Sequence, residues 1–63
     1  MMRTMRSGEL IGLIETAGSS LNRIRGSHHV FNHPDRPGLI VVPHPKKQLG
    51  KGLVSAIRKQ AGC

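Results

Sequence analysis

The spacing of apolar residues follows a helical period at both ends of the chain and a strand period in its middle. After Ser7, apolar residues recur at i, i+3, i+4 and i+7, which places them on one face of an amphipathic helix. The residues of this face are Leu10, Leu13, Ile14 and Ala17. Ser7 is the expected N-cap of this helix, and Gly18 is its expected end.

The middle of the chain has the alternation and the β-branched residues that are typical of strands. In the first strand, Ile24 falls on the face opposite to Arg23 and Arg25. Leu21 falls on the side of the arginines and interrupts the alternation. Turn-forming Gly, Ser, Pro and Asp residues separate the apolar segments. We therefore predict three strands, over residues 20–25, 28–32 and 39–42.

A second amphipathic helix of about ten residues is expected to begin near Lys51 and to end at Gly62. Its core side consists of Leu53, Val54, Ile57 and Ala61. Two apolar stripes this short are buried most simply if both helices pack on one face of a three-stranded antiparallel sheet. The predicted fold is therefore α+β with the order α-β-β-β-α. It forms a single domain over residues 7–63, preceded by a flexible basic arm over residues 1–6.

The length and charge of the chain restrict the ligands that it can bind. A chain of 63 residues buries only about 60% of the surface that its unfolded form exposes, so it lacks the volume for a deep metabolite pocket. Ten Lys and Arg residues stand against three carboxylates, which gives a net charge of +7 and a pI near 11.4. This balance favours a polyanionic partner and disfavours a small-molecule substrate.

The cysteine content and the hydropathy pattern favour a protein of the cytoplasm. Cys63 is the only cysteine, so no internal disulfide can form. The basic residues at the N-terminus are not followed by an apolar run of signal-peptide length, and no apolar stretch is long enough to span a bilayer. We therefore expect a cytoplasmic protein without a membrane partner.

The candidate catalytic residue is His28, because histidine can take up or release a proton near neutral pH without special surroundings. Phe31, the only aromatic residue, is expected to face the helices. Strand alternation then turns His28 toward the open face of the sheet, with Arg23 and Arg25 of the neighbouring strand on the matching side. A histidine beside arginines suits a phosphodiester. The alternative is a histidine that simply fills a strand position.

Two motifs give the chain a resemblance to a known family. The segment from Arg23 reads Arg-x-Arg-Gly-Ser-His-His-x-Phe, and the segment from Val42 reads Val-Pro-His-Pro. With these motifs and an opening like Ser-x-Glu-Leu-Ile, the chain from Met5 to Cys63 resembles the HicA-type toxins of bacterial toxin–antitoxin pairs. The resemblance implies a fold like that of double-stranded-RNA-binding domains, ribonuclease activity, and a HicB-type antitoxin as partner.

The resemblance also implies roles for single residues. The first histidine of Gly-Ser-His-His is the one tied to RNA cleavage in the family, and it corresponds to His28, with Gly26 setting its position and Ser27 in support. The chain departs from the family pattern at Ser19, where a large aromatic residue is usual, and at Leu53, where a small polar residue is usual. The lost core volume at Ser19 is expected to affect stability more than activity.

Two further histidines are expected to support the site. Strand alternation turns His29 away from His28, so that it packs or forms a hydrogen bond beside Phe31. His44 lies between two prolines, which stiffen its backbone. Its ring suits either an RNA contact or a hydrogen bond that fixes its loop.

A set of basic residues is expected to hold RNA through its phosphates. Lys46 and Lys47 form a charge run, for which a solvated loop is the alternative. Because Phe31 is the only aromatic residue, bases have no aromatic platform on which to stack, and sequence specificity should be low. The full set is Arg23, Arg25, Lys46, Lys47, Lys51, Arg58 and Lys59.

No metal or other cofactor is expected. The histidines do not suit a zinc site, because adjacent strand residues face opposite ways and His29 and His33 would lie about 13 Å apart along a strand. The only carboxylates are Glu9, Glu15 and Asp35. The first two would lie about 120° apart around a helix, so they cannot form a metal cage. The nucleophile for cleavage is therefore expected to be the 2′-hydroxyl of the RNA itself.

Together with the resemblance, these features predict a toxin that is a metal-independent endoribonuclease, an mRNA interferase that uses His28 as general acid or base. A HicB-type antitoxin, acidic where it covers His28, is expected to neutralise it. The alternative is a non-catalytic RNA-binding module in which His28 is incidental, and a turnover assay separates the two. A DNA-binding module is disfavoured because neither helix carries base-reading residues on one face beyond Arg58 and Gln60.

Overall fold

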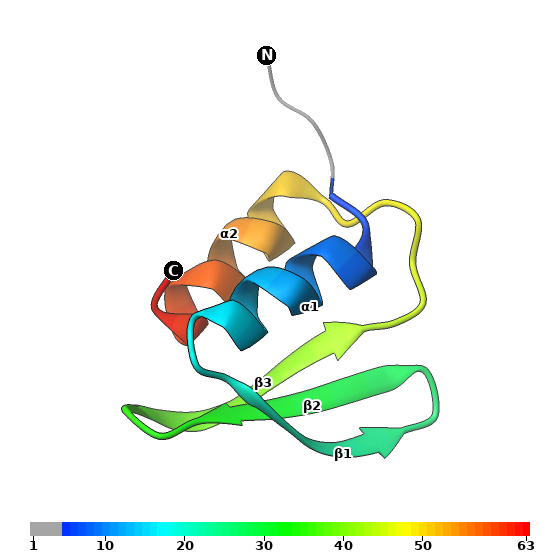
Figure 1. The fold of residues 1–63 in the computed structure, drawn as a ribbon. Coiled ribbons are helices and arrows are strands. Elements are labelled where there is room, and N and C mark those ends of the chain that lie inside the picture. The colour runs from blue at the N-terminus through cyan, green and yellow to red at the C-terminus, as the bar shows by residue number, and fades with distance from the viewer. Residues whose placement is uncertain (1–4) are drawn as a thin grey trace.

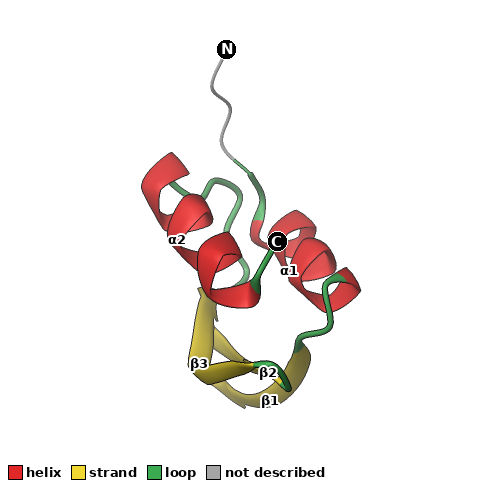
Figure 2. Cartoon of the chain, turned by 90° about the vertical axis from the view of Figure 1, so that its left-hand side faces the viewer, coloured by secondary structure: helices red, strands yellow, loops and turns green. Residues whose placement is uncertain are grey.

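The computed structural model describes residues 5–63 and has five elements in the order α-β-β-β-α (Figure 1). The strands form one antiparallel sheet in the order β1-β2-β3. Both helices lie on the same face of this sheet (Figure 2). The predicted α+β fold is confirmed. The elements are α1 (Ser7–Thr16), β1 (Ser20–Arg25), β2 (His28–His33), β3 (Arg36–Pro43) and α2 (Lys51–Ala61).

The core lies between the helix layer and the sheet. Phe31 at its centre is 1% exposed, so the single aromatic side chain faces the helices as expected. Because α1 and α2 both pack on β3, the apolar side chains of β2, β3 and the two helices meet in one cluster. Besides Phe31, the cluster contains Leu10, Ile14, Ile40, Val42, Leu49, Ile57 and Ala61.

The helices bury narrower faces than the sequence pattern indicates. Leu13 and Leu53, both expected in the core, are 39% and 41% exposed. Ile11 and Val54 pack against the core cluster. Each helix touches the core over a stripe centred on its fully buried residues, and a leucine at the edge of that stripe lies beyond the neighbouring elements. These two assignments to the core were wrong.

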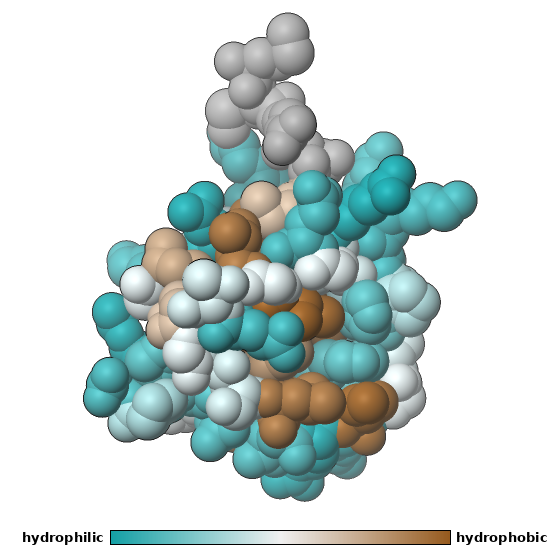
Figure 3. Space-filling view, in the orientation of Figure 1, coloured by the Kyte–Doolittle hydropathy of each residue, from teal (hydrophilic) through white to brown (hydrophobic). Residues whose placement is uncertain are grey.

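The strand β1 contains a bulge that places Leu21 on the helix-facing side of the sheet, whereas the sequence pattern placed it on the side of the arginines. The register shifts between Leu21 and Arg23, so that Leu21 lies opposite Phe31 while Arg23 lies opposite Val30. The extra residue of the bulge returns Leu21 to the helix-facing side, away from the arginines. β1 is an edge strand beyond the cover of the helices, so Leu21 remains 47% exposed, and Figure 3 shows apolar surface where β1 runs in Figure 1.

The turn between the second and third strands is shorter than expected. Arg36, Pro37 and Gly38 were predicted to belong to it, but they lie in β3, and only Pro34 and Asp35 form the turn. β3 is an edge strand with a register shift in this region, so the missing N–H of a proline is tolerated there.

The described chain begins just before α1. Met5 pairs with Leu49, and the N-cap of α1 is Arg6, so the expected N-cap Ser7 is instead the first helical residue. The Arg6 N–H donates to Oε1 of Glu9 over 3.1 Å. The rest of the predicted N-terminal arm, residues 1–4, lies outside the described residues. Within residues 5–63, no helix has the length and apolarity needed to cross a membrane.

Candidate functional site

The turn between β1 and β2 brings the first motif to one end of the sheet. Gly26 in this turn has a φ of 58°, the left-handed conformation that favours glycine, and a Cβ there would meet nothing within 4 Å. Arg25 lies directly opposite His28, and Arg23 lies opposite Val30. Residues directly opposite each other in an antiparallel pair share a face, so both arginines lie on the face of His28.

These side chains belong to an open groove on the sheet face that is turned away from the helices, which we call the outer face. Apolar side chains make up its other half: Leu39 is 50% exposed and Val41 is 45% exposed. An exposed cationic region thus borders an exposed apolar region, with His28 at the end of the sheet. The groove is lined by Arg23, Arg25, Gly26, His28, Val30, Leu39 and Val41.

The His28 side chain is exposed. Among residues 5–63, no side-chain hydrogen bond engages its ring. Both ring nitrogens can therefore exchange protons with a ligand on the outer face, which is the property that general acid–base catalysis requires.

The loop that follows β3 is tied to the turn that precedes His28. The His44 N–H donates to the Ser27 carbonyl oxygen over 2.9 Å. Nδ1 of the His44 ring lies 2.7 Å from Oγ of Ser7, at the start of α1. Of the two roles left open for His44, the loop-fixing hydrogen bond is therefore present. Figure 1 shows the three segments together at the same end of the molecule.

His29 points to the side opposite His28, as expected. It pairs with Ile24 and Val42 and is half-buried. Its ring meets the His44 ring edge to face, with centroids 4.6 Å apart and planes at 77°. Nδ1 of His29 is buried and has no hydrogen-bond partner among the described residues.

The predicted RNA-binding residues fall into three groups that the structure does not bring together. Arg23 and Arg25 line the outer face with His28. Lys46 and Lys47 lie in a groove beside the start of α1, at the same end of the sheet as His28. The remaining three belong to the helix layer: Lys51, Arg58 and Lys59.

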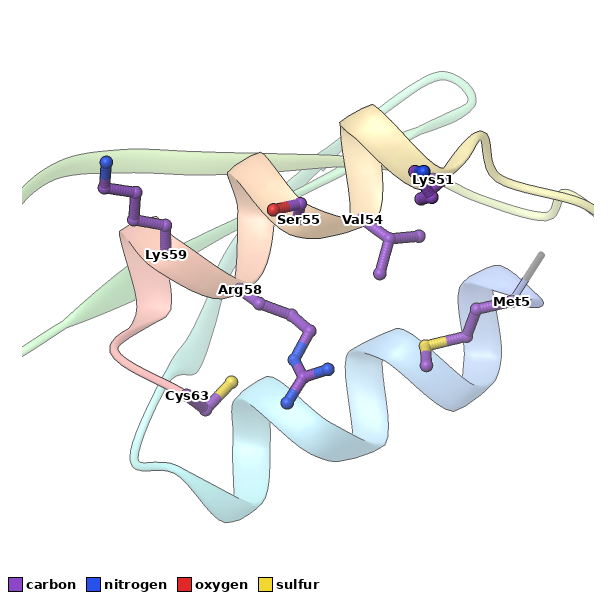
Figure 4. Close-up of a pocket in the computed structure, with 7 residues that line it drawn as sticks. All are labelled: Met5, Lys51, Val54, Ser55, Arg58, Lys59 and Cys63. Carbon is purple, nitrogen blue, oxygen red and sulfur yellow. The ribbon is translucent and has the colours of Figure 1, made fainter. Parts of the chain in front are cut away.

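This third group borders a groove between the helices, on the side away from the sheet. Figure 4 shows Arg58 extending from α2 toward α1 and ending near Cys63, whereas Lys59 points the other way. Val54 and Met5 form the apolar part of the groove. A ligand that touches both this groove and His28 must pass around an edge of the molecule.

No carboxylate lines the outer-face groove that contains His28. Glu9 lies in the groove of Lys46 and Lys47, where it accepts a hydrogen bond from the Arg6 backbone N–H, and Asp35 lies in the turn at the opposite end of the sheet. Among residues 5–63, no three His, Cys, Asp or Glu side chains are grouped so as to hold a metal ion.

A single protein-family model matches the part of the chain that contains both motifs and all five elements. Residues 7–63 match the family model described as the HicA toxin of bacterial toxin–antitoxin. The chain belongs to the HicA toxin family. This result confirms the resemblance carried by the two motifs, whose residues all lie within the matched range.

Two solved structures similar to this HicA-family chain are toxin–antitoxin complexes. A complex from Streptococcus pneumoniae contains a chain that is 28% identical, with a TM-score of 0.76 over 94% of this chain and 98% of that chain. The HicA3 and HicB3 toxin-antitoxin complex contains a chain that is 34% identical, with a TM-score of 0.74 over 92% of this chain and 94% of that chain. Comparison with curated proteins gives no match.

One residue near the HicA motifs was not recognised from the sequence. Ser7 was expected only to cap α1, but it is 1% exposed and its hydroxyl contacts both His44 and Lys46. The sequence does indicate this burial, because Ser7 lies three positions before Leu10 and so falls on the same face of the helix as the apolar residues.

Proposed function

We propose that this HicA-family protein is a metal-independent endoribonuclease that cleaves mRNA with His28 as general acid or base. The supporting observation is the His28 ring, which lies on the outer face beside Arg23 and Arg25 and which no side-chain hydrogen bond within residues 5–63 engages. Since the substrate is mRNA, the place of action is the cytoplasm.

The chemistry needs a proton acceptor, a proton donor and positive charge, and no metal ion. The 2′-oxygen bonds to phosphorus while the bond to the 5′-oxygen breaks, which leaves a 2′,3′-cyclic phosphate and a 5′-hydroxyl. His28 takes the proton of the 2′-hydroxyl or gives one to the leaving oxygen, and water serves the other step. Arg23 and Arg25 offset the charge that develops on the phosphoryl oxygens.

The substrate follows a path from the outer face around the end of the sheet. Lys46 and Lys47 are positioned to bind phosphates next to the scissile bond, since their loop adjoins the turn that carries His28. Lys51, Arg58 and Lys59 lie farther along, so they bind only RNA long enough to reach the helix layer. Contacts of this kind recognise the backbone and not the bases.

The proposed partner is a HicB-type antitoxin that covers the outer face. The similar solved chains occur in toxin–antitoxin complexes. Carboxylates of the antitoxin would pair with Arg23 and Arg25, and its apolar side chains would bury Leu39 and Val41, which are about half exposed. Such a complex blocks His28 by occupying the same surface as RNA.

The deciding experiment is cleavage of a defined RNA by pure protein with and without excess EDTA. We expect equal rates, and no cleavage when the nucleotide 5′ to the scissile bond carries a 2′-deoxyribose. Rapid cleavage of the deoxy substrate would contradict the mechanism. So would loss of activity in EDTA with an unchanged circular dichroism spectrum.

The alternative function is a non-catalytic RNA-binding module. The basic groups alone would suffice for it, and it predicts RNA binding without product formation at any enzyme concentration. The unengaged ring of His28 favours the ribonuclease.

A further inference from the structure

We propose that Ser7 and His44 are positioning residues for the cleavage reaction, because together they hold the backbone on both sides of His28. We call the two side chains and their hydrogen bonds the Ser7–His44 brace. This inference rests on the proposed ribonuclease function and assigns residues that act on the reaction through His28.

The Ser7 hydroxyl is the fixed point of the brace. Its Oγ lies 2.9 Å from the Lys46 backbone nitrogen, 3.2 Å from the Lys46 carbonyl oxygen and 2.7 Å from Nδ1 of His44. The Ser7 N–H also donates to the Lys46 carbonyl oxygen over 3.0 Å. The start of α1 and the loop after β3 are thus joined at a site that is 1% exposed.

The three contacts of the Ser7 hydroxyl constrain the orientation of the His44 ring. A hydroxyl donates one hydrogen bond and accepts two. Oγ accepts from the Lys46 N–H and donates to the Lys46 carbonyl oxygen. All three contacts are hydrogen bonds at once only if Nδ1 of His44 carries hydrogen and donates to Oγ. The brace therefore orients the His44 ring as well as its loop.

His44 contacts the residues on both sides of His28. Its N–H donates to the carbonyl oxygen of Ser27, the residue before His28. Its ring packs edge to face on His29, the residue after His28, with centroids 4.6 Å apart. No side chain of the described residues forms a hydrogen bond with the ring of His28 itself.

The strand pairs Arg25–His28 and His28–Pro43 hold the backbone of His28, but the turn itself projects beyond the sheet and has few other contacts. A Cβ at Gly26 would meet nothing within 4 Å, and Arg25 and Ser27 are exposed. A displacement of about 1 Å at a reacting group can cost on the order of 100-fold in rate. Losing the brace should therefore lower the rate of the chemical step more than the affinity for RNA, which depends on phosphate contacts spread over the surface.

A second histidine provides a matched control. At the opposite end of the sheet, Nε2 of His33 lies 2.8 Å from the Ala17 carbonyl oxygen, and its Nδ1 accepts a hydrogen bond of 3.0 Å from the Asp35 N–H. His33 thus ties the end of α1 to the sheet much as Ser7 ties its start, but at the end away from His28.

The test compares Ser7→Ala, His44→Ala and His33→Ala in single-turnover cleavage at saturating RNA, with rates expressed per folded molecule. We expect Ser7→Ala and His44→Ala to lower the rate at least about tenfold while the Kd for RNA changes less than about threefold. His33→Ala should lose stability and keep the rate. His44→Asn, whose amide can still donate to Ser7, should recover part of the rate.

Equal rates for Ser7→Ala and the wild type, or an equal loss in His33→Ala, would overturn the inference. Backbone amide exchange in the absence of RNA is an independent measure. Exchange at Ser27 to His29 should quicken in Ser7→Ala and not in His33→Ala. If the wild type does not cleave RNA, the proposed function fails, and unchanged exchange in Ser7→Ala would then refute the brace by itself.

Discussion

The two ends of the sheet each carry a histidine beside a turn, and the surroundings of the two rings differ. At one end, His33 has both ring nitrogens occupied, by the Ala17 carbonyl oxygen and the Asp35 N–H. At the other end, no side-chain hydrogen bond within residues 5–63 engages His28, which lies beside Arg25. The backbone of His28 is held through its neighbours, while its ring is left free.

This difference separates a structural histidine from a candidate catalytic one. A ring with two satisfied nitrogens contributes to stability but has no site left for a substrate proton. A free ring contributes little to stability and keeps both nitrogens for chemistry. Residue type and position in a motif do not make this distinction by themselves; the hydrogen-bond partners do.

The largest effect is expected from the removal of His28, with the removal of His33 as its control. His28→Ala should lower the cleavage rate by about 10²–10⁴-fold and leave the fold intact, because one proton-transfer group has about this effect on rate. His33→Ala should leave the rate per folded molecule unchanged. Single-turnover cleavage with circular dichroism on the same samples measures both. A His28→Ala protein that cleaves near the wild-type rate would show that the free ring is incidental.

Adding a methyl group at a glycine near each histidine should change the stability of the fold by different amounts. The two glycines are Gly18, between α1 and β1, and Gly26, between β1 and β2. Gly18 has a φ of 110°, and a Cβ there would lie 2.9 Å from Nε2 of His33. Gly18→Ala should therefore destabilise the fold by about 2–4 kcal/mol, through strain and the disturbed histidine hydrogen bond. Gly26→Ala has open space and only the left-handed backbone cost, about 1–2 kcal/mol. Urea unfolding compares them, and a larger loss at Gly26 would reverse the ranking of the two turns.

The basic loop with Lys46 and Lys47 should make the His28 end of the sheet contribute more to RNA binding than the His33 end. Replacing Lys46 and Lys47 with Gln should weaken binding to all RNA sequences alike. It should also reduce the salt dependence, since each contact to a single strand contributes about −0.7 to the slope of log K against log salt. Arg36→Gln, at the His33 end, serves as the control and should leave the slope unchanged. An unchanged slope for the lysine variant would mean that this loop is only solvated.

The smallest effect concerns two buried polar atoms, one near each end, that have no hydrogen-bond partner within residues 5–63. Ser19 Oγ lies near the His33 end, and His29 Nδ1 lies near the His28 end. Ser19→Ala removes an unsatisfied hydroxyl and should stabilise the fold by about 1 kcal/mol without changing cleavage. His29→Ala should instead lower stability and cleavage together, because it removes the ring that packs on His44. Thermal unfolding and the cleavage assay test both, and a destabilised Ser19→Ala protein would show that its hydroxyl has a partner in solution.

The order of the elements and the side of the sheet on which His28 lies could be predicted from the amino-acid sequence alone. Both follow from local geometry, because a strand alternates its side chains every two residues and a helix every three to four. Once Phe31 is placed in the core, His28 must face outward, and the arginines of the neighbouring strand follow. The bounds of β1 and the start of α2 were also readable from this pattern.

The face of Leu21, the exposure of Leu13 and Leu53, and the role of Ser7 depend on contacts between elements that are distant in the chain. The face of Leu21 depends on a bulge in its register with β2, and the two leucines depend on where neighbouring elements end. The Ser7 hydroxyl meets His44 and Lys46 across 37 and 39 positions of the chain. No local period encodes contacts at such separations, since they arise from the packing of the helix layer on the sheet.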